Sequence, residues 1–292
     1  MQVVLALDTG NSRHEYDNSF LFCQSKIRII ERLRVMKILF FAFFLVSCTS
    51  GVYNPPQKLT VEMLSVGQGL AFLIRGEKCA TLYDTGTPLS RIDTMLVNRG
   101  IKELCSVILS HPHNDHTGGM AVLQEMEKRG DLKIGRVLTY NKVLRNDTLS
   151  DFLPWTARIL WAGNGTTIFD DAEEAGNEVS IVMRISDGKN SFLFMGDLES
   201  GQEYSLLQLE PLLDATALQV GHHGSKTSSS WKFLSQIQPK IAFISAGKGN
   251  SYGHPHEETL AKLHLILPDS SQIFRTDLEG STEVIWIYGI GL

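Results

Sequence analysis

One short segment, His111-Pro112-His113-Asn114-Asp115-His116, limits what this 292-residue chain can fold into. It directly follows residues 107–110 (Val-Ile-Leu-Ser), which have the composition of a buried strand. A tight loop at a strand end points several side chains at one spot, and imidazole with carboxylate suits Zn²⁺, Mn²⁺ or Fe²⁺. The segment therefore predicts a metal site, the alternative being a polar loop that is rich in histidine by chance.

Histidines also cluster elsewhere in the chain. Of nine histidines, seven fall into three clusters, and only His14 and His264 stand alone. Histidines scattered over a surface would not group in this way, so a functional site is the leading explanation. The clusters are His111, His113 and His116; His222 and His223; and His254 and His256.

The composition is that of an ordinary globular protein, with 43% apolar and 20% charged residues. It excludes a largely disordered chain, a collagen-like chain and a disulfide scaffold. The net charge is -5, and the part after residue 47 carries an excess of seven acidic side chains. An acidic body argues against a broad electrostatic surface for DNA or RNA, although a local basic groove stays open.

The N-terminal part has the features of an export signal. The basic residues Arg32, Arg34 and Lys37 precede a nine-residue apolar core at 38–46. The tetrapeptide Leu45-Val46-Ser47-Cys48 resembles a bacterial lipobox, in which the cysteine is lipidated and becomes the mature N-terminus. The alternative is a buried core strand or helix.

This pattern predicts four segments. Residues 1–35 are expected to be an extension without function, 36–48 a lipoprotein signal peptide, 49–58 a tether and 59–292 the functional domain. Lipidation at Cys48 would anchor the protein in the bacterial cell envelope, facing an extracytoplasmic space.

From residue 59 onward, strand-like and helix-like segments alternate, without repeats or low-complexity tracts. This alternation predicts one α/β domain of about 235 residues in which helices cover two sheets. Helices are expected at residues 92–98, 117–128, 201–213, 229–236 and 255–267. Strands are expected at residues 59–66, 70–75, 80–84, 106–110, 137–140, 179–185, 192–195, 215–220, 241–245, 272–275 and 283–288.

Cys79 and Cys105 each lie in an apolar, strand-like segment of this domain. Two cysteines can pair in an oxidising compartment, but the sequence does not give the distance between their Cα atoms. The preferred interpretation is two small, unpaired core residues.

These motifs resemble those of a known family. The pattern H-x-H-x-D-H after a strand is typical of the metallo-β-lactamase superfamily, whose fold is a four-layer αββα sandwich with one or two metal ions along the sheet edges. Further segments follow in the order that this family shows. They are Tyr83-Asp84-Thr85-Gly86, Phe194-Met195-Gly196-Asp197 and Val220-Gly221-His222-His223-Gly224-Ser225.

Three segments narrow the resemblance to the metallo-β-lactamase-like domain of the ComEC-type DNA-uptake competence proteins. The similarity runs from about residue 59 to residue 267, but Ser65 and Leu70 stand where family members often carry acids. ComEC-type proteins couple this domain to a membrane channel, which this chain lacks, so the resemblance does not extend to DNA transport. The segments are Ser65-Val66-Gly67-Gln68-Gly69, residues 220–228 and Tyr252-Gly253-His254-Pro255-His256.

The resemblance implies two neighbouring metal positions. The first is held by His111 and His113, with Asn177 standing where the superfamily usually has a third histidine. An amide oxygen is a weaker ligand than imidazole, so this position is expected to bind its ion loosely. The ComEC-like branch shares the asparagine.

The second position is held by Asp115 and His116 together with His222 or His223, and the sequence does not separate these adjacent histidines. Asp197 is expected to bridge the two positions. The implied cofactor is one or two divalent ions, Zn²⁺ or Mn²⁺.

Water bound to such an ion ionises near neutral pH, so the expected mechanism is attack by a metal-bound hydroxide at a catalytic centre that includes Asp115. Asp84 is expected to orient a metal-bound histidine rather than to bind metal. His254 is expected to protonate the leaving group or to bind a phosphate oxygen, the alternative being a helix cap.

Ser225, Lys226, Thr227 and Ser228 precede a helix that is expected near Trp231. Hydroxyls, a lysine and free amides at a helix N-terminus form an anion site, which favours a phosphate-bearing substrate over a lactam. The alternative is a serine-rich helix cap.

Together these features predict a metal-dependent hydrolase, a phosphodiesterase or nuclease, whose substrate is DNA, RNA or a small phosphodiester. A hydrolase of a carbonyl substrate (lactone, lactam or thioester) is the second hypothesis. A non-catalytic envelope binding module is the third, supported only by Asn177, Ser65 and Leu70. No protein partner follows from the sequence.

Overall fold

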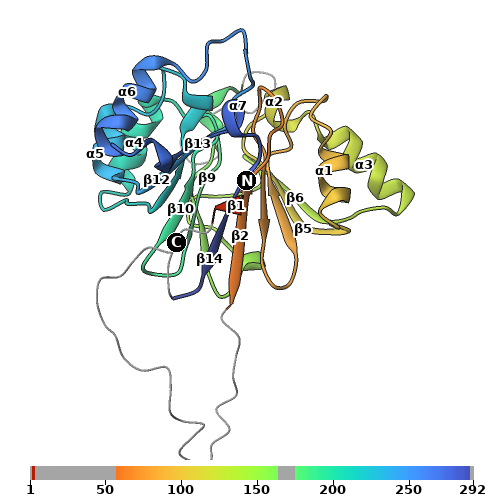
Figure 1. Cartoon of the computed structure of the whole chain (residues 1–292). Helices are drawn as coiled ribbons and strands as arrows, with labels where there is room; N and C mark the ends of the chain where they lie inside the picture. The colour runs from red at the N-terminus through yellow and green to blue at the C-terminus, as the bar shows by residue number, and fades with distance from the viewer. Residues whose placement is uncertain (1, 4–56, 164–174, 290–292) are drawn as a thin grey trace, which may run out of the picture. The chain divides into compact units, whose positions relative to one another are not determined.

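The computed structural model describes residues 2–3, 57–163 and 175–289, which form two mixed sheets that face each other (Figure 1). The first sheet contains, in spatial order, β1 (Gln2–Val3), β14 (Thr282–Ile287), β2 (Lys58–Met63), β3 (Phe72–Arg75), β4 (Ala80–Tyr83), β5 (Glu103–Leu109) and β6 (Lys133–Thr139). The second contains β13 (Ile273–Arg275), β12 (Ile241–Ile244), β11 (Ala217–Gln219), β10 (Ser191–Phe194), β9 (Val182–Ser186), β8 (Thr156–Trp161) and β7 (Thr148–Leu149).

The central core lies between the two sheets. Successive side chains of a strand point to opposite faces, so alternate residues of β2 and β10 enter this core. Phe72 of the first sheet makes edge contacts with Phe192 and Phe194 of the second, with ring centroids 5.7 and 5.3 Å apart. Leu193, between the two phenylalanines, faces the opposite way and belongs to another cluster.

Helices cover the outer face of each sheet (Figure 1). On the first sheet, α1 (Ile92–Asn98) and α3 (Met120–Arg129) bury Leu96, Leu123 and Met126 against the strands. The second sheet is covered by α4 (Ser200–Leu209), α5 (Trp231–Ile237) and α6 (Glu257–Ile266). The four-layer αββα sandwich is therefore confirmed. Short helices are α2 (Asn114–Thr117) and α7 (Thr276–Glu279).

The start of helix α3 differs from the sequence prediction. Helix α1 has the expected bounds, but the helix expected at 117–128 starts only at Met120, and α2 forms a separate turn before it. Gly118 and Gly119 lie between them, where an added Cβ would be 2.3 Å from Pro88 Cδ and 2.4 Å from Thr85 O, respectively. The close approach of Pro88 and Thr85 leaves no room for a side chain at either glycine.

Cys79 and Cys105 form a disulfide, so the interpretation as two unpaired core residues is wrong. Cys79 directly precedes β4 and Cys105 lies in β5, and these two strands pair in parallel. Their Cα atoms are 5.9 Å apart, within the range that a disulfide spans. The bond therefore ties neighbouring strands of the first sheet.

The expected signal peptide and lipidation site lie outside the described residues. Only β1, at residues 2–3, is described in the N-terminal segment, and it pairs in parallel with β14. The lipidation of Cys48 and the roles assigned to residues 1–35, 36–48 and 49–58 therefore stay predictions. Within 57–163 and 175–289, no helix is both long and apolar enough to span a bilayer.

Candidate metal centre

The candidate site is formed by loops that follow the carboxyl ends of strands in both sheets. In the first sheet, β4 ends just before Asp84 and β5 just before residues 110–116. In the second sheet, β10 precedes Asp197, and β11 precedes a 3-10 turn, Gly221–Gly224, that carries the adjacent histidines. Because both pairs of strands run parallel, their carboxyl ends lie at one edge and the following loops converge.

Four of the predicted ligands form a tight cluster, with one ligand atom from each lying within 4.8 Å of the others. His116 Nε2 lies 3.1 Å from Asp197 Oδ2 and 3.3 Å from His223 Nε2. Asp115 Oδ2 lies 3.2 Å from His223 Nε2. Two imidazoles and two carboxylates directed at one point form a donor set that suits a divalent ion.

Two unpaired oxygens support this assignment. Asp197 Oδ1 and Asn177 Oδ1 are buried and have no hydrogen-bond partner among the described residues. A buried acceptor without a partner costs free energy, about 1–3 kcal/mol and more for a charged group. A bound cation offsets that cost, so the residues present fit a divalent ion.

Each clustered histidine is oriented through its Nδ1. Asp84 is fully buried, accepts two hydrogen bonds of 2.7 Å from Ser110, and lies 2.8 Å from His116 Nδ1. His223 Nδ1 donates to the carbonyl of Ser245 at 2.8 Å. With Nδ1 engaged, Nε2 of each ring faces the cluster. Asp84 thus lies beside a candidate ligand, where the sequence placed it.

The side chains of the adjacent residues His222 and His223 point to different partners. His222 (φ 48, ψ 49) and His223 (φ 53, ψ 22) are both in the left-handed region, which costs of order 1 kcal/mol or more for residues other than glycine. Their side chains consequently reach different partners. His223 enters the four-residue cluster, whereas His222 lies beside Asn177 and Glu199.

His111 and His113 lie at the edge of this cluster. His111 Nε2 is 3.0 Å from His113 Nδ1, and the His111 ring centroid is 4.1 Å from that of His116. Burial, with a smaller contribution from His116, holds the pKa of His111 well below its usual range. His111 is therefore a neutral imidazole, the form in which histidine binds metal.

The charges of the cluster compensate one another. Burial is the largest single effect and opposes the charged form of both histidines, but the neighbouring carboxylates together outweigh it. Asp197 and Asp84 raise the pKa of His116, and Asp197 and Asp115 raise that of His223 to about 9. Burial also opposes ionisation of the carboxyls, yet the histidines hold the pKa of Asp197 well below its usual range and lower that of Asp115 to about 2. The metal-free cluster therefore pairs two carboxylates with two imidazolium ions.

The cluster opens into a cavity of about 350 Å³, and none of its lining residues is aliphatic. Gln68 and Tyr252 lie in segments that carry the family resemblance, although the sequence assigned them no role. Asn114 lies within the first histidine motif. The lining residues are Gln68, His113, Asn114, Asp115, Asp197, His222, His223, Tyr252 and His254.

The loop before β3 closes against the first motif. Leu70 N donates to the carbonyl of Asp115 at 3.1 Å, and a Cβ at Gly69 would be only 2.4 Å from that oxygen. Gln68 is thereby held at the cavity, where its Oε1 accepts a hydrogen bond from Gly247 N at 3.0 Å. A polar residue between two glycines was the only signal of this role in the sequence.

His254 lines the cavity from the loop before α6. Burial, reinforced by His223 and His222, lowers the pKa of its imidazole to about 4, so the ring is neutral at pH 7. Its Nδ1 lies 3.3 Å from the amide Nε2 of Gln68. With Nδ1 accepting from that amide, the proton of the neutral ring is on Nε2, and His254 is a hydrogen-bond donor.

The residues of the expected anion loop do not line the cavity. Ser228 Oγ donates to Gly221 O at 2.7 Å, and Ser225 Oγ lies 3.0 Å from Thr227 Oγ1. Helix α5 is capped by Ser230, which accepts from Phe233 N. This geometry favours the alternative interpretation, a serine-rich helix cap. Lys226, which the sequence placed in the anion site, is exposed and does not line the cavity.

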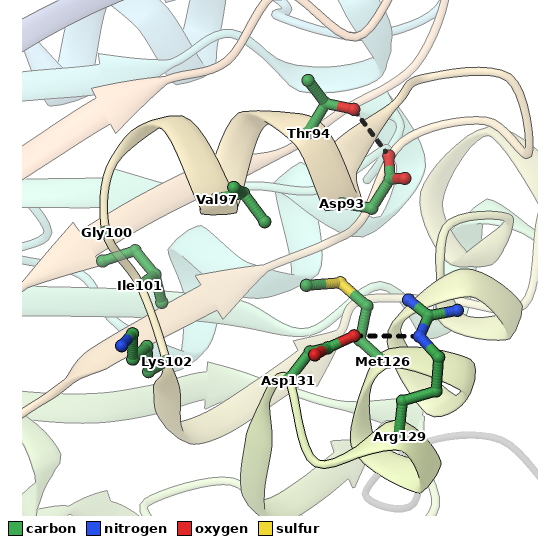
Figure 2. A pocket seen from close by; sticks show the side chains of 9 residues that line it. All are labelled: Asp93, Thr94, Val97, Gly100, Ile101, Lys102, Met126, Arg129 and Asp131. Carbon is green, nitrogen blue, oxygen red and sulfur yellow. Dashed lines mark hydrogen bonds and ion pairs between the residues drawn. The ribbon is translucent and has the colours of Figure 1, made fainter.

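A larger groove of about 450 Å³ lies between α1 and α3 (Figure 2). It contains no predicted site residue. Arg129 Nε is 2.9 Å from Asp131 Oδ2, so these two charges pair with each other. Candidate metal ligands therefore line the cavity of about 350 Å³ and not this groove.

Fold and site together define the class of this protein. Residues 64–248 match the family model of the metallo-beta-lactamase superfamily, and the chain belongs to that superfamily. It has the fold of a metal-dependent hydrolase, with a His/Asp cluster that is able to hold metal.

Among curated proteins, the chain is 33% identical to Recombination protein 2 of Haemophilus influenzae, over 80% of this chain and 30% of the relative. It is 28% identical to ComE operon protein 3 of Bacillus subtilis, over 76% of this chain and 32% of the relative. Competence protein ComA of Neisseria gonorrhoeae is 30% identical, over 81% of this chain and 33% of the relative. The resemblance to competence proteins is confirmed, and the chain spans about a third of their length.

Among solved structures, the chain is similar to YhfI, a metallo-beta-lactamase fold protein from Bacillus subtilis. The TM-score is 0.50 at 12% identity, over 78% of this chain and 99% of YhfI. At this identity the similarity supports the fold alone.

Proposed function

We propose that this protein is a metal-dependent phosphodiesterase or nuclease. The observation that carries the proposal is the cluster of Asp115, His116, Asp197 and His223, with an unpaired Asp197 oxygen, opening into a cavity without aliphatic residues. A lining of imidazole, amide, carboxylate and phenol groups suits a charged substrate, whereas a lactam or lactone would find no aliphatic side chain to contact there.

In such a site, one set of residues binds the metal ion and a second set orients the metal-binding histidines. Asp115, His116, Asp197 and His223 would hold a divalent ion, Zn²⁺ or Mn²⁺, and such an ion would supply positive charge and a water that ionises near pH 7. Asp84 and the carbonyl of Ser245 fix the ring orientation of His116 and His223. Correctly held ligands keep the ion in place without rearrangement during the reaction.

His254 binds the substrate rather than acting as an acid. Its neutral ring carries the proton on Nε2, because Gln68 is placed to donate to Nδ1. A neutral imidazole donor stabilises negative charge on a phosphate oxygen as it develops. Of the two roles expected for His254, the geometry supports the hydrogen bond to a phosphate oxygen.

Nucleic acid is one candidate substrate, since relatives carry the names recombination and competence protein. The excess of acidic side chains after residue 47 favours a short or single diester over long duplex. The disulfide supports an extracytoplasmic location, because such bonds persist in oxidising compartments. We place the protein in the bacterial cell envelope, held by a lipid on Cys48.

The test is hydrolysis of bis(p-nitrophenyl) phosphate by metal-free protein supplied with Mn²⁺ or Zn²⁺ separately. Metal-dependent turnover is expected, with a loss of at least about 100-fold in Asp197→Ala, since loss of a single charge-stabilising group costs about that much. Asp131→Ala, on the surface away from the cavity, is the matched control and is expected to keep full turnover.

Other outcomes point to the rival functions. Protein that binds metal but does not hydrolyse the diester would support a carbonyl substrate, to be assayed with a lactone, a lactam and a thioester. Protein that binds neither Mn²⁺ nor Zn²⁺ would support a non-catalytic binding module.

A further inference from the structure

Glu199 stands at the start of α4, but its side chain does not cap that helix. Its Oε1 lies 3.1 Å from His222 Nδ1 and accepts hydrogen bonds from Asn177 Nδ2 (3.2 Å) and Thr227 Oγ1 (2.9 Å). The amide of Ser200 instead donates to the carbonyl of Thr227. The Glu199 carboxylate is therefore turned away from its own helix and toward the metal centre.

This carboxylate engages the donor atoms of two candidate ligands and leaves their acceptor atoms free. On Asn177, the NH₂ group is bonded and the buried Oδ1 has no partner among the described residues. On His222, a proton on Nδ1 leaves the lone pair on Nε2, which lies 3.8 Å from Asp197 Oδ2. Asn177 Oδ1 and His222 Nε2 are thus free to bind a cation beside the carboxylate of Asp197.

We propose that Glu199 is a positioning residue. It holds Asn177 and His222 so that Oδ1 and Nε2, together with Asp197, form a second cation position beside the four-residue cluster. The proposal rests on the metal centre of the proposed function, but not on which bond the protein hydrolyses.

Within the described residues, Asp84 and His116 form a comparable arrangement. Asp84 lies at Nδ1 of His116, whose Nε2 is 3.1 Å from Asp197. A carboxylate behind a metal-binding histidine fixes the ring and raises its basicity. Glu199 differs from Asp84 in exposure, since its side chain is 37% exposed and that of Asp84 is fully buried. It can therefore be replaced without leaving a buried charge unpaired.

The experiment is titration of the metal-free, full-length protein with Mn²⁺ alone, followed by calorimetry and by the electron paramagnetic resonance signal of free Mn²⁺. The wild type is expected to bind two ions with different affinities. Glu199→Ala is expected to weaken the second ion about 10–100-fold and to leave the first unchanged. Glu199→Gln keeps an acceptor oxygen and is expected to restore most of the second affinity.

A matched control and a spectroscopic readout separate positioning from loss of structure. Gln202→Ala, in the first turn of the same helix, is expected to bind both ions as the wild type does. In protein with ¹⁵N-labelled histidine, Zn²⁺ is expected to shift Nε2 of His222 in the wild type but not in Glu199→Ala. The shifts of His116 and His223 are expected in both proteins.

Three results would overturn the proposal: a single ion bound by the wild type, an unchanged second affinity in Glu199→Ala, or equal loss of both ions in the alanine and glutamine variants. The proposed function fails separately. Wild-type protein that binds two ions in a Glu199-dependent way but does not hydrolyse the diester would refute the phosphodiesterase and leave this inference intact.

Discussion

His223 is held in the cluster by charge as well as by geometry. Its Nε2 lies 3.2 Å from Asp115 and 3.4 Å from Asp197, and its Nδ1 donates to a backbone carbonyl. Burial opposes the charged form of the ring, but Asp197 and Asp115 raise its pKa to about 9. In the metal-free protein, the protonated ring therefore stabilises the fold, and a metal ion has to displace that proton.

This predicts a pH dependence of stability that metal removes. A raised pKa adds stability that is complete below the unfolded value of about 6.5 and is lost as the pH rises through about 9. The free energy of unfolding of metal-free protein, measured with urea, is therefore expected to fall by on the order of 3 kcal/mol between pH 6 and pH 9. With saturating Mn²⁺, the fall is expected to disappear.

The control for this prediction is His264→Gln, at an exposed position of α6 outside the site, which is expected to keep the full pH dependence. His223→Gln is expected to reduce it, and the part that comes from the raised pKa of His116 is expected to remain. A metal-free wild type that is equally stable at pH 6 and pH 9 would contradict the charge state assigned to His223.

Residue types decided which site positions could be predicted from the sequence. Histidine and aspartate in close spacing indicate metal ligands, and the structure brings Asp115, His116 and His223 together. Gln68 and Glu199 could not be identified, since glutamine and glutamate serve many structural purposes. Only the folded chain brings Gln68 to the cavity and Glu199 to His222. Residues 225–228 led to the opposite error. Their hydroxyls suggested an anion site, but in the structure Ser225, Thr227 and Ser228 form hydrogen bonds within the protein.

At the scale of elements, strong periodicity was easier to interpret than mixed patterns. Helix α1 has the predicted bounds, since its apolar spacing is regular and a glycine follows it. Strand β8 was not predicted. It alternates between exposed and buried residues at first but ends in three consecutive buried ones, so it matches neither a half-buried nor a fully buried strand.

The disulfide provides a prediction for one pair of strands. It joins residues 26 positions apart, and closing a loop of that length stabilises a protein by about 2–4 kcal/mol. Cys105→Ala is therefore expected to lower the free energy of unfolding by about that amount in urea. Dithiothreitol is expected to lower wild-type stability similarly and to have no effect on Cys105→Ala; an equal effect on both proteins would show that the bond contributes nothing.

At the scale of the whole molecule, the sandwich was predictable because several motifs occur in the order of one superfamily and each falls at a strand end. The match of residues 64–248 to the family model confirms that reasoning. The pairing of Cys79 with Cys105 could not be predicted, since it depends on how two segments are registered in the first sheet. The signal peptide and the lipidation site, which lie outside the described residues, stay predictions.

Lipidation of that segment is testable in whole cells. Protein expressed in a bacterium with an alkyne-labelled palmitate analogue is expected to carry the label and to fractionate with the envelope. Cys48→Ser is expected to lose both properties, whereas Cys23→Ser, upstream of the lipobox, is expected to keep them. A label that persists in Cys48→Ser would refute the anchor.

The cluster has a consequence for how the protein acquires its ion. His116 and His223 face each other across 3.3 Å, yet they lie 107 positions apart in the chain and follow strands of different sheets. A partly folded chain contains no such site, so the ion is selected only after both sheets have docked. Cu²⁺ and Zn²⁺ bind most imidazole sites more tightly than Mn²⁺ does. The identity of an ion bound by this cluster would therefore depend on the metals available in the compartment where folding finishes, as well as on the donor set.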